Sequence, residues 1–206
     1  MGVRIVPKVD SREYRNLQLL QPNQSEKRIE SDYYVEGYAT TFDKPYLLYE
    51  YDGVKYYEVI DRKALDQADL SDVIMQYDHN GKVFARNTNK TLGLEPDNEG
   101  FFIFADLSKS EASREMYNEI ETGLVTRMSW AFVVAEDSYN SETRTRTILK
   151  VKKVYDVSAV SIPANDDTTI SARSYFDGVI EMEKQELLER RKKRLALELK
   201  FMEVIK

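Results

Sequence analysis

Three residues whose side chains serve in hydrolytic chemistry stand far apart in the sequence: His79, Ser129 and Asp156. His79 is the only histidine of the chain, and a neutral imidazole is the side chain best suited to accept a proton near neutral pH. A serine nucleophile that relies on such a base must therefore use His79. A carboxylate bonded to the other ring nitrogen would orient the base. Acyl transfer is the chemistry that these three residue types can perform together.

His79 and Ser129 each have a structural explanation as well. A lone histidine in the polar stretch YDHNG is usually an exposed turn residue. A serine within the apolar stretch MSWAFVV usually bonds to a nearby carbonyl in the core. Strand alternation puts Ser129 on the face opposite Met128, Trp130 and Phe132. The strand is a rigid platform under either explanation.

Asp156 interrupts the apolar segment VYDVSAVSI, where an unpaired charge would be costly. Its partner is either a basic neighbour such as Lys152 or Lys153, or His79. Metal and cofactor chemistry have less support. One histidine, no cysteine and scattered carboxylates give no ligand spacing, and no glycine-rich phosphate loop occurs. We therefore expect neither a metal nor a cofactor.

The composition is typical of a folded globular chain of 206 residues, with 42% hydrophobic and 32% charged residues. A net charge of −6 argues against a general nucleic-acid binder. The sequence lacks a membrane-spanning apolar run and the apolar core of a secretory signal. The absence of cysteine suits a reducing compartment. These features predict a cytoplasmic protein without membrane or nucleic-acid partners.

The hydrophobic patterns predict an α+β fold that is rich in strands. A short helix is expected at 61–68, with Asp61 as its N-cap. A second helix follows Ser108 or Ser110 and ends before Gly123 at the C′ position. Strands are predicted in the following segments: YYVEGYATTF, GVKYYEVID, VIMQY, VFAR, LGLE, FFIFADL, MSWAFVVAEDS, TRTRTILKVKKV and VYDVSAVSI.

We predict three parts along the chain. Residues 1–31 form an N-terminal arm or linker with room for one early strand, and residues 32–175 form the main domain. Residues 176–206 contain no proline and are dense in Glu, Lys, Arg and Leu, so they predict a long charged helix. An imperfect apolar stripe suits a partner helix or packing on the domain. The basic run ERRKKR, at 189–194, is interpreted as a solvated helix face.

Four segments in this order resemble the prohead protease family of tailed phages. They read YDHNG, TLGLEPDNEGFF, the helix that runs into GLVTRMSWAF, and VYDVSAVSIPAND, within the range from Val35 to Arg173. The resemblance implies a closed β-barrel with flanking helices, similar to herpesvirus assemblin. It puts the family histidine at His79 and the family serine at Ser129. Asp156 takes the third position, where assemblin uses a second histidine that this chain lacks.

The resemblance implies a serine endopeptidase of capsid maturation, enclosed in the immature prohead within the bacterial host cytoplasm. Such an enzyme removes the scaffolding region of the major capsid protein and cleaves itself. The helix at 176–206 would then dock on the scaffold, mediate self-association, or be a tail removed by self-cleavage. Arg127 and Ala131 stand where the family often has glycine, and Trp130 where phenylalanine is common.

A non-enzymatic capsid assembly or scaffolding protein is the alternative interpretation. Such a protein would also have a net negative charge and a C-terminal helix, but it would not need the side chains of His79, Ser129 and Asp156 to lie together. The distance between Ser129 Oγ and His79 Nε2 separates the two hypotheses.

Overall fold

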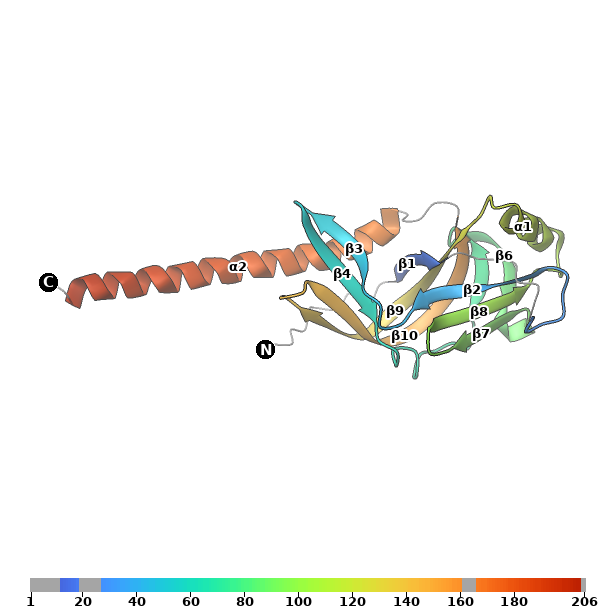
Figure 1. Cartoon of the computed structure of the whole chain (residues 1–206), viewed down its shortest axis with the longest axis horizontal. Helices are drawn as coiled ribbons and strands as arrows, with labels where there is room; N and C mark the ends of the chain where they lie inside the picture. Colours follow the sequence, from blue (N-terminus) through green and yellow to red (C-terminus); the bar gives the residue numbers. More distant parts are fainter. Residues whose placement is uncertain (1–11, 19–26, 161–165, 205–206) are drawn as a thin grey trace.

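Two β-sheets, the short helix α1 and the long helix α2 make up the computed structural model, which describes residues 12–18, 27–160 and 166–204. The sheets and α1 form the body of the molecule, and α2 projects from it as a rod (Figure 1). This arrangement is α+β, as the sequence predicts.

The larger sheet has seven strands and is built around two long neighbours, β9 and β10. Its main path runs in the order β1 (Glu13–Gln18), β9 (Arg127–Asn140), β10 (Thr145–Val160), β4 (Val54–Ile60) and β3 (Tyr46–Tyr51). A side branch adds β5 (Ile74–Tyr77), which pairs with β10, and β6 (Asn80–Arg86), which pairs with β5. The strand β1 is the early strand that the arm was expected to contain.

The smaller sheet has three antiparallel strands, β2 (Tyr34–Thr41), β8 (Gly100–Asp106) and β7 (Leu92–Pro96). A 3-10 turn, η1 (Asn87–Asn89), precedes β7. The sequence DNEG closes the β7–β8 hairpin as predicted, and the Asp97 amide donates to the Gly100 carbonyl at 2.9 Å.

The expectation of a closed β-barrel is wrong. The larger sheet ends at β1 and at β3, and β2, β8 and β7 form a sheet of their own among the described residues. One edge of β10 is shared, since β4 pairs with its residues 145–148 and β5 with its residues 156–159. The larger sheet therefore forks at β10 instead of closing on itself.

Helix α1 (Glu111–Glu121) has the ends that its sequence predicts. Ser110 is the N-cap, and its Oγ accepts from the Ser113 amide at 3.1 Å. Gly123 lies at C′ with φ +76°, and the Leu124 amide returns to the Glu119 carbonyl at 2.9 Å, which is a Schellman ending. Five residues, 122–126, therefore separate the end of α1 from the start of β9.

The expected helix at 61–68 is a run of tight turns instead. The Ala64 carbonyl, which a helix would bond to the Ala68 amide, accepts from the Val151 amide of β10 at 2.8 Å. The Ala68 amide donates to the Leu65 carbonyl instead. Pairing with the sheet therefore prevents the helical hydrogen bond.

The two strands expected at TRTRTILKVKKV and VYDVSAVSI form the single strand β10 as far as Val160, and the last two residues of the second segment lie outside the described residues. Irregularities in its register with β9 let it continue across the boundary between the two patterns. Because β10 is one strand, it ties the β4 half of the sheet to the β5 half.

The core lies against the apolar face of β9. Trp130 and Phe132 stack with ring centroids 3.9 Å apart, and Phe101 of β8 meets Trp130 edge-on at 5.9 Å. Met128, Trp130 and Phe132 are fully buried in this cluster. The alternation predicted for the strand therefore holds, and the other face of β9 is left for Ser129.

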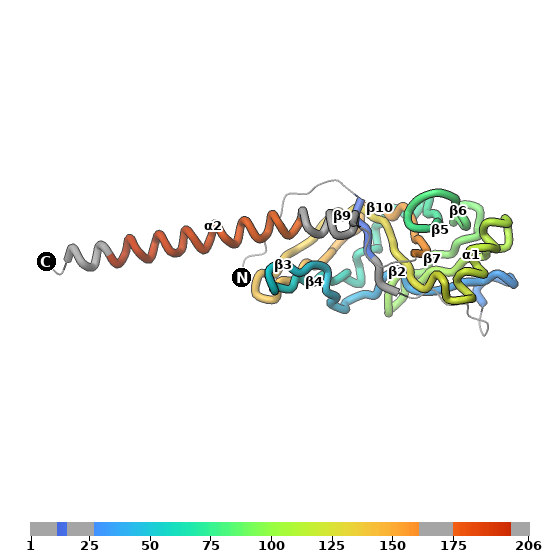
Figure 2. The backbone as a smooth tube through the Cα atoms, turned by 90° about the horizontal axis from the view of Figure 1, so that it is seen from above, coloured from blue at the N-terminus to red at the C-terminus, as the bar shows by residue number. Residues whose placement is uncertain are grey.

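Helix α2 (Asp166–Val204) begins before Phe176, the start that the sequence predicted. The helix residues before Phe176 include β-branched and hydroxyl side chains of low helix propensity. For this reason the sequence pattern does not indicate the first turns of α2. Phe176 and Val179 pack with Tyr56 and Tyr139 in a small apolar cluster. Beyond this contact α2 leaves the body (Figure 2). In the described part of the chain no helix is long and apolar enough to cross a membrane.

Candidate active site

The neighbouring strands β9 and β10 carry two of the three candidate residues on one face. Ser129 lies opposite Ser158, and Ala131 lies opposite Asp156. A register shift between Val154 and Asp156 leaves Tyr155 as an extra residue, which is a β-bulge. Val154 is buried in the core. Without the bulge, alternation would turn Asp156 toward the core as well, so the bulge aims Asp156 at Ser129.

The hairpin that joins β5 to β6 supplies His79. Tyr77 pairs with Asn80, so Asp78 and His79 form a two-residue loop, and their φ values are +44° and +56°. Positive φ at both positions is the requirement of a type I′ turn. The Asp78 amide donates to the Ala159 carbonyl at 3.0 Å, which ties the turn to β10. A histidine held at positive φ costs free energy, and such strain is often found at functional sites.

The three side chains meet in one line of hydrogen bonds. His79 Nε2 lies 2.6 Å from Ser129 Oγ, and His79 Nδ1 lies 2.6 Å from Asp156 Oδ1. An ionised carboxylate only accepts, so Nδ1 carries the ring proton and Nε2 is free to accept from the serine hydroxyl. The structure therefore brings together all three residues that the sequence nominated, on a turn and two strands.

Ser158 and Tyr14 complete the surroundings, and sequence reasoning missed both. Ser158 Oγ donates to Asp156 Oδ1 at 2.6 Å. The Tyr14 ring meets the His79 ring edge-on with centroids 4.5 Å apart. Ser158 follows Asp156 by two residues, a spacing that signals a shared strand face. Nothing in the sequence of the N-terminal arm points to Tyr14.

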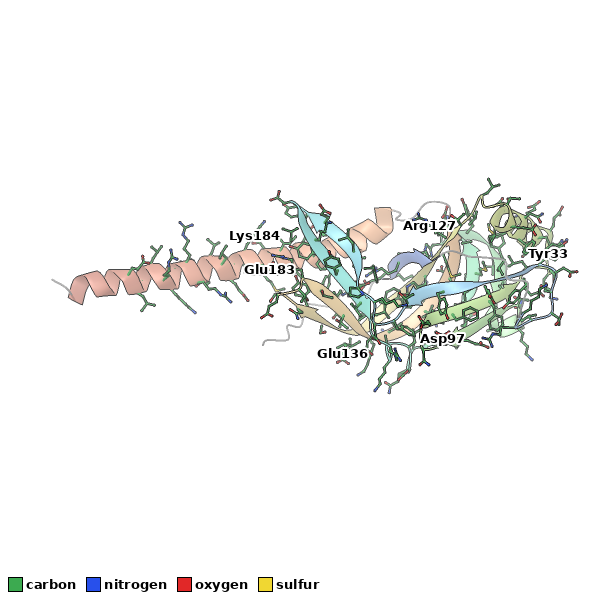
Figure 3. All side chains as sticks on the ribbon, in the orientation of Figure 1. Tyr33, Asp97, Arg127, Glu136, Glu183 and Lys184 are labelled. Atoms are coloured by element: carbon green, nitrogen blue, oxygen red, sulfur yellow. The ribbon has the colours of Figure 1, made fainter. Side chains whose placement is uncertain are left out.

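The site is closed to solvent. Ser129 is fully buried, Asp156 is 2% exposed and the His79 side chain is 10% exposed. Arg127 begins β9 as an exposed residue (Figure 3). The described residues contain no cluster of three or more side chains suited to hold a metal ion.

A serine, a histidine and a carboxylate in this order form the constellation of serine hydrolases. The chain belongs to the caudovirus prohead serine protease family, whose family model matches residues 21–182. No curated protein and no solved structure matches the chain. The protein is a serine endopeptidase of phage capsid maturation, and the resemblance drawn from its motifs is confirmed. The expected similarity to herpesvirus assemblin is not shown.

Proposed function

We propose that Ser129 is the nucleophile, His79 the general base and Asp156 the residue that orients the base. The substrate is the scaffolding region of the major capsid protein, and the enzyme also cleaves itself. The reaction takes place inside the immature prohead in the bacterial host. No metal or cofactor takes part, because the three side chains supply the chemistry.

The reaction is acyl transfer. His79 Nε2 takes the hydroxyl proton while Ser129 Oγ attacks the carbonyl carbon of the scissile peptide bond. Backbone N–H groups beside Ser129 receive the oxyanion, and Asp156 stabilises the imidazolium. His79 then gives the proton to the departing amine. A water molecule, activated by the same base, releases the acyl group and restores the serine.

The observation that carries this proposal is the pair of hydrogen bonds on the two nitrogens of the only histidine. A scaffolding protein has no use for a serine, a histidine and an aspartate from three separate elements in one line. A core serine would bond to a carbonyl, whereas Ser129 Oγ lies 2.6 Å from His79 Nε2. A turn histidine on the surface would not be nine-tenths buried.

The remaining parts of the chain have supporting roles in this proposal. Residues 32–175 are the protease domain, and residues 1–31 are an arm. The charged helix, residues 176–206, docks the enzyme on the scaffold, mediates self-association, or is removed by self-cleavage. Leu188 and Leu195 are exposed and seven residues apart, which is a heptad spacing that suits a helical partner.

The test is intact-mass analysis of the major capsid protein co-expressed with the wild type or with Ser129→Ala. We expect shortening with the wild type and full-length capsid protein with the variant, whose stability should change by about 1 kcal/mol or less. Ser113→Ala is the matched control, because Ser113 is equally buried but bonds only to Ser110 and to the Phe84 carbonyl. Shortening by Ser129→Ala would remove Ser129 as the nucleophile.

A further inference from the structure

The N-terminal strand β1 covers the edge of β9 at the candidate nucleophile. The two strands are antiparallel, with Glu13 opposite Phe132, Tyr14 opposite Ala131 and Asn16 opposite Ser129. β1 is the last strand of the larger sheet on this side (Figure 1). Without β1, the β9 edge would offer a row of unpaired backbone groups, which is a template for another extended chain.

β1 runs antiparallel to β9 and approaches Ser129 from its N-terminal end. Its residues approach Ser129 in the order Glu13, Tyr14, Arg15 and Asn16. An extended peptide that adds to a sheet edge takes its affinity from backbone hydrogen bonds and its specificity from alternate side chains. β1 already makes this ladder, and it passes Ser129 and continues to Gln18, which lies opposite Met128.

While β1 is in place, a peptide carbonyl has no access to the serine. The Ser129 side chain is fully buried, and Tyr14 packs its ring on His79 at 4.5 Å. Attack requires the reacting atoms to come within about 3–3.5 Å. The hydrogen bonds of the three candidate residues are therefore formed, but in a closed state.

The other face of β1 is anchored by charges instead of apolar side chains. Arg15 Nε lies 2.5 Å from Glu58 Oε1, and Glu13 Oε2 lies 2.7 Å from Arg146 Nη1. Arg12, next to β1, holds its guanidinium 3.8 Å above the ring centre of Tyr155, the bulged residue of β10. Buried ion pairs hold a strand in register, but they contribute little net stability.

The cluster that β1 enters remains paired when β1 leaves. Arg146 still contacts Glu58 at 3.2 Å and Asp137 at 2.7 Å. β1 brings one acid, Glu13, and one base, Arg15, so its departure leaves the net charge of the cluster unchanged. No buried charge is therefore left without a partner, which is the large penalty that would otherwise lock a strand in place.

We propose that β1 is an internal occupant of the substrate edge of β9. An extended segment of the substrate pairs with β9 beside Ser129 only after β1 has left. The inference rests on the proposed role of Ser129. The family match begins at residue 21 and so leaves out β1, which fits an addition to the protease domain.

The first test locks β1 in place. Tyr14 and Ala131 are opposite each other, and the chain has no cysteine, so Tyr14→Cys with Ala131→Cys introduces a single possible disulfide. The readout is the rate at which a fluorophosphonate probe labels Ser129. We expect oxidation to slow labelling by about 10-fold or more and reductant to restore it, because only the open fraction reacts. The wild type should not respond to reductant.

The second test loosens β1. Arg15→Gln removes the charge that pairs with Glu58 and should raise the labelling rate severalfold, while Arg62→Gln, which removes an exposed ion pair with Asp43 away from β1, serves as the control. Equal labelling of the oxidised and reduced double variant, or no rise with Arg15→Gln, would overturn the inference alone. Absence of labelling in both the wild type and Arg15→Gln would overturn the nucleophile assignment, and this inference with it.

Discussion

Two buried polar clusters lie on the two faces of β1, and they are built differently. On one face, beside Tyr14, a line of hydrogen bonds joins Ser129, His79, Asp156 and Ser158. On the other face is the ion cluster, whose members are charged side chains from four strands: Glu13, Arg15, Glu58, Asp137 and Arg146. The line ends in a hydroxyl that faces a base, whereas the ion cluster has a partner for every charge.

The two clusters suit two different uses of buried polar groups. A single line of hydrogen bonds fixes the tautomer of the histidine ring and the direction in which the serine proton can move. A reactive site needs both. A closed set of ion pairs fixes the register of strands and offers nothing to a substrate. Changes in the line should therefore alter rate with little loss of stability, and changes in the ion cluster should do the reverse.

The largest effect is expected for Asp156→Asn. The amide keeps the shape of the side chain, but it no longer holds the Nδ1 proton of His79, so the wrong tautomer faces Ser129. Cleavage should fall on the order of a thousandfold or more, with the melting temperature nearly unchanged. Steady-state proteolysis and thermal denaturation measure the two quantities. A loss below about tenfold would contradict the orienting role of Asp156.

Arg146→Met should have the largest effect on stability. It leaves Glu13 and Glu58 short of a cation in a buried place, which costs about 3–5 kcal/mol. Lys150→Met is the matched control on the same strand, since its partner Glu136 is half exposed (Figure 3), and it should cost about 1 kcal/mol or less. Urea denaturation gives both values. Equal costs would remove the ion cluster as a structural centre.

Acid should weaken the ion cluster through Glu13. Burial acts to raise the pKa of Glu13, but the charges of Arg15 and Arg146 outweigh it and lower that pKa from 4.5 to about 2. This contribution to stability is therefore complete above 4.5 and is lost as the pH falls toward 2. The protection factors of the β1 amides against hydrogen exchange, which are corrected for the intrinsic rate at each pH, should fall across that window. In Glu13→Gln the window should show a flatter response.

The smallest of these effects is expected for Ser158→Ala. Its hydroxyl donates to the Asp156 oxygen that also faces His79, so it positions the carboxylate without touching the substrate. The loss of one such bond costs about 1 kcal/mol, a roughly fivefold fall in kcat. KM should not change, because no binding contact is lost. An unchanged kcat would assign Ser158 a purely structural role.

The candidate site could be nominated from the sequence because four motifs in order resemble the prohead protease family, whereas the residue types alone left a structural explanation open for each of the three residues. One histidine limits the choice of base, and a carboxylate within an apolar strand needs a partner. The sequence could not show that the partner is His79, because this depends on the bulge at Tyr155 and on the positive φ of the Asp78–His79 turn. Both are backbone features without a local sequence signal as strong as Asn-Gly.

The fold was predicted well where periodicity is local and poorly where tertiary pairing decides. The caps of α1 follow from Ser110 and Gly123 alone. The predictions of a helix at 61–68 and of a closed barrel were both wrong. Each outcome depends on which distant strand forms hydrogen bonds with the backbone groups concerned. β1 was expected only as a strand, and its place beside β9 depends on buried charges that hydrophobic patterning does not register.

The projecting helix has a consequence for where the enzyme can act. At 39 residues, α2 is about 58 Å long at 1.5 Å per residue, and most of that length stands clear of the body (Figure 2). If α2 docks the enzyme on the scaffold, as proposed above, the catalytic body reaches only bonds within a fixed radius of that anchor. Local concentration then takes over part of the selection that a binding pocket would otherwise perform. Within a closed shell, the distance of a peptide bond from the anchor would then help to decide whether it is cleaved.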